Sequence, residues 1–182
     1  MTRALLRMIS LAGILLFAAM AGAQQPLPGD AFGVEVTLAP KTVVSLSGQG
    51  RWDTAFETVV EALKNVHAYL EREGIAPAGP AMVIYTSADD TGFQFEAAVP
   101  IAKPLPNPPK GDLSMGASPE GKAYKFTHRG SYDSMDNTYE AITNFLDQKN
   151  LDSKDAFIEE YETDPRNTPD DKLVINIYVP IP

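Results

Sequence analysis

The spacing of apolar residues predicts two amphipathic helices. In the first, apolar side chains recur every three or four positions, which is typical of a helix with one buried face. Asp53 or Thr54 is suited to cap its start, and Gly74 to end it. This first stripe consists of Phe56, Val59, Val60, Leu63, Val66 and Leu70. A second helix is expected over 134–150, with a stripe made of Met135, Tyr139, Ile142 and Leu146.

Short apolar or alternating runs between these helices predict strands, because such runs bounded by turn residues are typical of β-structure. Polar turns are expected at 88–92 and at 164–171, each between two of the strands. The strands are expected at 34–40, 42–48, 81–87, 93–101, 123–129, 156–163 and 172–181.

The chain also contains a weak internal repeat. The run Gly50-Arg51-Trp52-Asp53 is echoed by Gly130-Ser131-Tyr132-Asp133, and Val99-Pro100-Ile101 is echoed by Val179-Pro180-Ile181 at the same offset. Each copy reads β-α-β-β, and one such unit cannot bury its apolar face alone. We therefore predict an α+β fold for a single domain over 34–182: duplicated β-α-β-β units with pseudo-twofold symmetry, an antiparallel sheet with helices packed on one face, and a central cleft between the halves.

The two halves are assigned to 34–101 and 113–182. The segment 102–112 between them holds four prolines, which exclude a helix or an interior strand and favour an extended linker. A proline-recognition motif is the alternative interpretation of this linker. Residues 24–33 are expected to form a flexible mature N-terminus.

The first 23 residues have the pattern of a signal peptide. Arg3 and Arg7 precede an apolar run, and Ala21-Gly22-Ala23 supplies the small residues of a cleavage site. The run is short for a membrane span, which needs about 20 residues. An uncleaved anchor is the alternative. We expect an exported protein, with the periplasm as its location, and no membrane span after cleavage.

Composition narrows the possible partners. The net charge is −9, and cleavage after Ala23 would remove two arginines and no acid, so binding to nucleic acid is not expected. The chain has no cysteine, which excludes disulfides and thiolate metal sites. His67 and His128 have no ligand spacing, and the acidic turns do not match a calcium loop. We therefore expect no metal and no cofactor.

One carboxylate stands out near the C-terminus. In the strand 156–163, side chains alternate between faces, so Phe157, Glu159 and Tyr161 share one face. The opposite face, with Glu160 and Glu162, is expected to be solvated. An ionised acid between two aromatic rings is costly to bury unless it finds a partner, and this makes Glu159 the leading candidate for a functional residue.

The second half resembles a known family. The stretch "YKFTHRGSYDSMDNTYEAITNFL" and the ending "FIEEYETDPRNTPDDKLVINIYVPI" are similar to the HRG-x-Y turn, the E-x-Y-x-x-D-P run and the terminal V-P of the GyrI-like small-molecule-binding domain, also called the bacterial transcription-activator effector-binding domain. The similarity extends over roughly 34–181. The regulators of this family carry a DNA-binding domain, whereas this chain begins with a signal segment, so we expect an exported stand-alone domain.

The resemblance implies a ligand site in the central cleft. In the family, the glutamate of the E-x-Y motif faces bound ligands that are often cationic and aromatic, which places Glu159 and Tyr161 in the site. If Tyr85 is the repeat equivalent of Tyr161, then Val83 is that of Glu159, and the first half supplies an apolar wall. The ligand-binding residues expected are Glu159, Tyr161, Tyr85, Trp52 and Tyr132.

Each of these residues also has a purely structural interpretation. Glu159 could pair with a lysine or arginine at a sheet edge, and Tyr85 and Tyr161 could simply fill the interface between the halves. Trp52 and Tyr132 occupy equivalent strand-to-helix junctions, where they could form the rim of a cleft or cover a helix start.

Two classes of function remain open, with a third below them. The first is a binding protein for a small amphipathic molecule, such as a cationic or aromatic one, held over an acidic floor. The alternative is a hydrolase of a reactive small molecule, with Glu159 as general base and Tyr161 or Tyr85 as hydrogen-bond donor. A protein-interaction role through the linker or a sheet edge is the third. The sequence does not decide whether the chain is an enzyme.

Overall fold

The computed structural model describes residues 31–153 and 156–182. The signal-peptide prediction and residues 24–30 of the expected N-terminal segment lie outside these residues. Eight strands form one antiparallel sheet in the order β1-β6-β8-β7-β3-β4-β2-β5. The strands are β1 (Val34–Leu38), β2 (Thr42–Gly50), β3 (Ala81–Ala88), β4 (Phe93–Pro100), β5 (Leu113–Ala117), β6 (Gly121–Arg129), β7 (Phe157–Tyr161) and β8 (Val174–Pro180).

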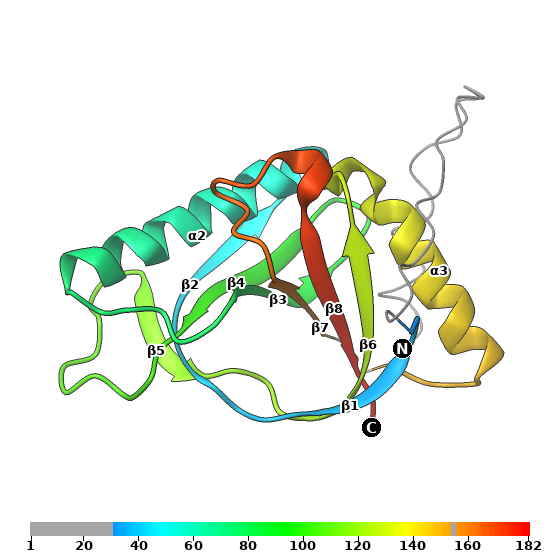
Figure 1. The fold of residues 1–182 in the computed structure, drawn as a ribbon, viewed down its shortest axis with the longest axis horizontal. Helices are drawn as coiled ribbons and strands as arrows, with labels where there is room; N and C mark the ends of the chain where they lie inside the picture. The colour runs from blue at the N-terminus through cyan, green and yellow to red at the C-terminus, as the bar shows by residue number, and fades with distance from the viewer. Residues whose placement is uncertain (1–30, 154–155) are drawn as a thin grey trace.

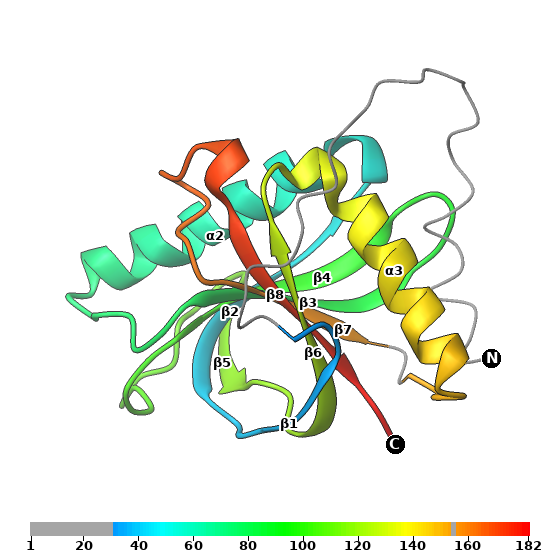
Figure 2. The same ribbon diagram turned by 45° about the vertical axis from the view of Figure 1, so that its right-hand side comes forward.

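Both long helices cover the same face of the sheet, as expected. Helix α2 (Ala55–Arg72) and helix α3 (Met135–Gln148) begin close together over the middle of the sheet and diverge from there (Figures 1 and 2). One-turn 3-10 helices, η2 (Trp52–Thr54) and η3 (Tyr132–Ser134), precede them, and a third, η4 (Asp170–Lys172), precedes β8. The stripe of α3 is buried throughout, so the two helices and the inner face of the sheet enclose the main core. The α+β prediction is confirmed.

The register of the sheet confirms the internal repeat. Gly50 lies opposite Phe93 in the pair β2–β4, and Val43 lies opposite Pro100; Ala123 lies opposite Pro180 in the equivalent pair β6–β8. In the central pair β3–β7, Val83 lies directly opposite Glu159. Since the repeat also makes Val83 and Glu159 equivalent, the pseudo-twofold axis passes between these two residues.

The outermost strands are exchanged between the halves. Strand β1, assigned to the first half from sequence, pairs with β6 of the second half, whereas β5 pairs with β2 of the first. Strand β5 was missed by sequence reasoning, because "LSMGA" contains a glycine and too little apolar alternation. The two connections that carry the exchange run side by side along the lower edge in Figure 1, where the Ser118 N–H donates to the Lys41 carbonyl at 2.9 Å.

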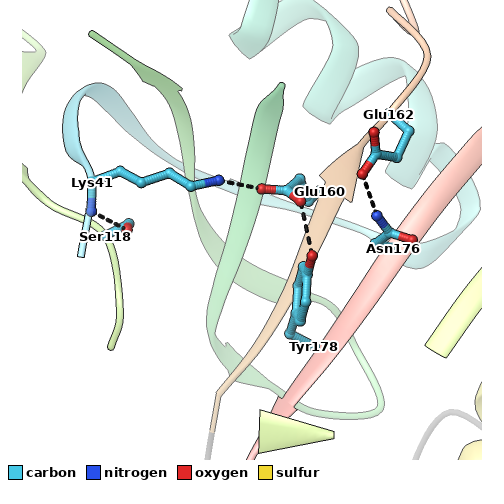
Figure 3. Close-up of polar contacts among 6 residues, drawn as sticks. All are labelled: Lys41, Ser118, Glu160, Glu162, Asn176 and Tyr178. Carbon is cyan, nitrogen blue, oxygen red and sulfur yellow. Dashed lines mark hydrogen bonds and ion pairs between the residues drawn. The ribbon is translucent and has the colours of Figure 1, made fainter. Parts of the chain in front are cut away.

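The prediction that the second face of the β7 strand is solvated holds for Glu162, which is exposed just beyond the end of β7, but is wrong for the rest of this face. Glu160 is only 7% exposed and Ile158 only 4% exposed. Lys41 reaches across this face to bring its Nζ within 2.6 Å of Glu160 Oε2, and the Tyr178 hydroxyl donates to Glu160 Oε1 at 2.9 Å (Figure 3). Ile158 belongs here to a small second cluster of buried apolar residues, together with Val43, Met82, Ile84 and Ala98 from neighbouring strands.

The remaining segments connect or flank these elements. The linker 102–112 contains no helix or strand, as expected from its prolines, although Leu105 packs against the main core. At the other end of the described chain, the Phe32 ring packs edge-on against the rings of Phe126 and Phe145. Within the described residues, no helix is long and apolar enough to cross a membrane.

Candidate ligand-binding cavity

A cavity of about 820 Å³ opens between the starts of the two helices and the central strands. It lies close to the pseudo-twofold axis, so both halves contribute to its wall, as expected for a cleft between them. Glu159 from β7 lies at its inner end, while the turns that lead into α2 and α3 form its mouth. Its lining consists of Arg51, Trp52, Asp53, Ala55, Tyr85, Asp90, Thr91, Tyr132, Asp133, Met135, Asp136, Tyr139, Phe157 and Glu159.

Tyrosine hydroxyls surround the carboxylate of Glu159. The Tyr139 hydroxyl donates to Oε1 at 2.7 Å, and the Tyr161 hydroxyl donates to Oε2 at 2.8 Å. Tyr85 donates to Oε2 at 3.2 Å, and its hydroxyl lies 3.1 Å from that of Tyr132. The side chain of Glu159 is 1% exposed, and within the described chain no lysine or arginine forms an ion pair with it. The described residues therefore do not contain the alternative considered from sequence, an ion pair of Glu159 at a sheet edge.

Burial controls the protonation of this cluster. Loss of water raises the pKa of Glu159, and the hydrogen bonds from the tyrosine hydroxyls oppose that rise by stabilising the ionised form. Burial, together with the nearby charge of Glu159, raises the pKa of Tyr85 and Tyr139 well above the usual range. The tyrosines therefore stay protonated and act as donors to the carboxylate.

Aromatic rings form the wall above this floor. Phe157 stacks on Tyr85 with centroids 4.3 Å apart, and Tyr139 meets Phe157 edge-on at 5.1 Å. Across the boundary between the halves, Phe56 stacks on Tyr132 at 4.8 Å. In these contacts the rings of the wall pack on one another.

The mouth of the cavity is acidic. Asp53 and its repeat equivalent Asp133 flank it, with Asp90 and Asp136 nearby. Arg51 is the single basic residue among the lining residues described, and its Nε lies 3.1 Å from Asp53 Oδ1. Its repeat equivalent is Ser131, so only one side of the mouth carries a guanidinium beside its aspartate.

The residues expected from sequence occupy different positions around this cavity. Tyr85, Tyr132 and Glu159 line it together. Trp52 lies at its mouth, where its indole N–H donates to the Asp89 carbonyl at 2.7 Å. Tyr161 lies behind the carboxylate and is not a lining residue, although its hydroxyl contacts Glu159.

Two details of the wall differ from the expectation. Val83 is fully buried opposite Glu159 and does not line the cavity. The first half does not supply the apolar wall expected, because its lining residues are mostly polar: Arg51, Trp52, Asp53, Ala55, Tyr85, Asp90 and Thr91. Tyr139, which makes the shortest contact with Glu159, was interpreted from sequence only as part of a helix stripe. A tyrosine on a stripe that otherwise holds Met135, Ile142 and Leu146 was the available signal, because its hydroxyl needs a partner when buried.

Comparison with known families gives one match, which covers most of the chain. The family model of the GyrI-like small molecule binding domain matches residues 34–182. No curated protein sequence shows significant similarity to the chain.

Several solved structures share the fold. The C-terminal domain of EcmrR superposes with a TM-score of 0.68 at 13% identity, covering 82% of this chain and 96% of that domain. The chain spans 56% of EcmrR as seen in its DNA complex, with a TM-score of 0.70. A hydrolase encoded by lin2189 from Listeria innocua gives 0.60 at 13% identity, covering 83% of this chain and 92% of that one. SAV2435 bound to tetraphenylphosphonium gives 0.56 at 13% identity, with 82% and 93% covered. At this level of identity, the similarity establishes the fold.

Proposed function

The chain belongs to the GyrI-like small-molecule-binding domain family, and on that premise we propose that its cavity binds an organic cation with aromatic groups, using Glu159 as the charged floor. The observation that carries the proposal is the buried carboxylate, 1% exposed, which has hydroxyl donors but no cationic partner in the described chain. Burying an uncompensated charge is costly, and a bound cation would remove much of that cost.

The cavity wall supports the same class of ligand. Tyr85, Tyr132 and Phe157 present rings close to the carboxylate, and aromatic faces attract cations when both are out of water. The volume of about 820 Å³ lies within the range of about 300–1,000 Å³ found for small-molecule sites. The acidic mouth attracts cations and repels anions over the last few ångströms of approach.

The test uses two aromatic phosphorus compounds, one cationic with four phenyl rings and one neutral with three. Tetraphenylphosphonium, the ligand present in the SAV2435 structure, supplies the cation, and triphenylphosphine oxide supplies a neutral aromatic analogue. By isothermal titration calorimetry, we expect the wild-type protein to bind the cation and not the neutral compound. Glu159→Gln should weaken cation binding by about tenfold or more, since it removes a buried charge while keeping a similar volume.

The neighbouring residue provides the control. Glu160→Gln makes the same chemical change one position away, on the opposite face of the sheet, so it should leave cation affinity unchanged. Equal binding of the two probes by the wild-type protein, or an undiminished affinity in Glu159→Gln, would remove Glu159 from the site.

A hydrolase is the alternative function, and one observation favours it. Burial raises the pKa of Glu159, as a general base for water requires, and Tyr85 lies beside it as a donor. Two similar solved structures from Listeria innocua are described as hydrolases. The discriminating experiment is turnover of reactive esters: hydrolysis by the wild-type protein that disappears in Glu159→Gln, while tetraphenylphosphonium still binds the wild type, would place catalysis at the same cavity.

We further propose that the protein acts after export, with the periplasm as its location. The proposal is supported by the arginines, the apolar run and the Ala21-Gly22-Ala23 site in the first 23 residues. Cell fractionation with N-terminal sequencing tests it: a periplasmic product that begins at Gln24 is the expected result. A cytoplasmic product that retains Met1 would contradict it.

A further inference from the structure

A buried histidine connects the two segments that deliver Tyr132 and Tyr139 to the cavity. His128, at the end of β6, is only 4% exposed. Its Nδ1 lies 2.8 Å from the Thr138 hydroxyl, and its Nε2 lies 3.0 Å from the Ser131 carbonyl oxygen. Ser131 directly precedes Tyr132, and Thr138 directly precedes Tyr139. The imidazole ring of His128 therefore contacts the chain next to each of these two tyrosines of the Glu159 cluster.

The two contacts determine which nitrogen carries the proton. A carbonyl oxygen can only accept, so Nε2 is the protonated nitrogen and donates to Ser131. In the neutral ring, Nδ1 then accepts the hydrogen bond of the Thr138 hydroxyl. Burial lowers the pKa of His128, which favours this neutral form.

The internal repeat shows what the same framework does without the imidazole. The repeat equivalent of His128 is Gly48, where an added Cβ would lie 2.6 Å from the ring of Phe95. Thr58, the equivalent of Thr138, turns its hydroxyl back to its own helix and donates to the Thr54 carbonyl at 2.7 Å. The equivalents of Tyr132 and Tyr139 are Trp52 and Val59. At these equivalent positions the first half therefore has neither the imidazole nor the phenols, although it folds in the same way.

From this difference we propose that His128 is a positioning residue, which holds Tyr132 and Tyr139 around the Glu159 carboxylate so that the cavity is preorganised for a cation. The identity of the ligand rests on the proposed function, but the positioning of the two tyrosines by His128 is a property of the ligand-free protein. Fixing donors in advance is a general way to strengthen binding, because less order must be created when the ligand arrives.

The test removes one hydroxyl in each half. Thr138→Val deletes the hydroxyl that His128 contacts while keeping the shape of the side chain, Thr138→Ser restores it, and Thr58→Val makes the same change at the equivalent site of the first half. The pKa of Glu159 is then measured in the ligand-free protein by carboxyl ¹³C NMR, and tetraphenylphosphonium affinity by calorimetry. We expect Thr138→Val to raise the pKa of Glu159, because weakened hydroxyl donors stabilise the carboxylate less, and to weaken binding roughly five- to tenfold.

Thr138→Ser and Thr58→Val should both retain the wild-type pKa of Glu159 and the wild-type affinity. An unchanged Glu159 pKa in folded Thr138→Val, or an equal rise in Thr58→Val, would overturn the positioning role. If no protein binds tetraphenylphosphonium, the proposed function fails, while the pKa comparison still decides the role of His128. Should Thr138→Val not fold, ¹⁵N NMR of the wild-type imidazole decides instead: a ring protonated only on Nδ1 would contradict the proposal.

Discussion

Glu159 combines two properties that rarely occur together in an acidic side chain, full burial and the absence of a cationic partner among the described residues. Its hydroxyl donors, led by Tyr139 at 2.7 Å, stabilise the ionised form, but burial still raises its pKa. The free protein therefore holds a carboxylate that a cation can neutralise and that a proton can neutralise in competition.

That competition predicts how binding depends on pH. Since a cation favours the ionised carboxylate, tetraphenylphosphonium affinity should fall as the pH drops through the raised pKa of Glu159, and should level off above it. Calorimetric titrations of the wild-type protein across the acid range measure this. An affinity that stays constant over the range in which NMR shows Glu159 becoming protonated would contradict the prediction.

The same raised pKa predicts the stability of the Glu159→Gln variant. The folded state binds a proton at Glu159 more tightly than the unfolded chain does, so this group lowers stability as the pH rises from about its ordinary value of 4.5 through the folded pKa. At neutral pH the variant should unfold at the same or a higher temperature than the wild type. Thermal denaturation followed by circular dichroism checks this, and a large decrease would mean that the ionised carboxylate is structurally required.

At the scale of elements, β7 has a different polar partner on each face. Glu159 faces the tyrosines, and Glu160 on the reverse contacts Lys41, which comes from the connection between β1 and β2. The Lys41 side chain is 42% exposed and that of Glu160 is 10% exposed, so water screens this pair only in part. Lys41 thereby fixes an exchanged connection to a central strand.

Removing this contact should therefore destabilise the fold. We expect Lys41→Met to lower the free energy of unfolding by about 1–2 kcal/mol, because Glu160 keeps only the Tyr178 hydroxyl as a partner. Urea denaturation measures the change. Lys64→Met, which removes the exposed pair with Glu61 on α2, serves as the control and should cost less than about 0.5 kcal/mol. Equal effects in the two variants would show that the Lys41 contact is no stronger than a surface ion pair.

Local patterns predicted the elements whose residues alternate or recur regularly. Both helix stripes, the strands around Val83 and Ile177, and the shared face of Glu159 and Tyr161 could be read in this way, since each depends on periodicity alone. Strand β5 could not be predicted in this way, because Gly116 and its small neighbours interrupt the alternation of apolar and polar positions. The burial of Glu160 was missed since it depends on Lys41, more than a hundred residues earlier in the chain. For His128, the sequence was considered only for the spacing typical of metal ligands. Its hydrogen bonds with Ser131 and Thr138 do not depend on that spacing, so they were missed.

At the scale of the whole molecule, the exchange of β1 and β5 makes each half dependent on the other. The first half supplies β1 to β6, and the second supplies β5 to β2, in addition to the central pairing of β3 with β7. The linker 102–112 contributes no strand to any of these pairings. Covalent continuity through the linker is therefore not what holds the halves together.

A chain divided within the linker should still assemble. Fragments 31–106 and 107–182, produced together, are expected to copurify as a complex that binds tetraphenylphosphonium, whereas each fragment alone should lack a cooperative unfolding transition, because it leaves strand edges and an apolar face uncovered. Affinity copurification and thermal denaturation measure the two outcomes. Cooperative folding of either fragment by itself would contradict the interdependence of the halves.

The position of Glu159 opposite Val83 also limits the kind of molecule in which such a site can exist. In a homodimer of a single unit, the residue at this point of the axis would lie opposite its own copy. A glutamate would then bring two carboxylates into direct cross-strand contact in a dry interior, where both could not be ionised together. Joining two units in one chain lets one copy carry the acid and the other a valine, so the charge on the axis belongs to one carboxylate, with no second carboxylate opposite it to share its proton.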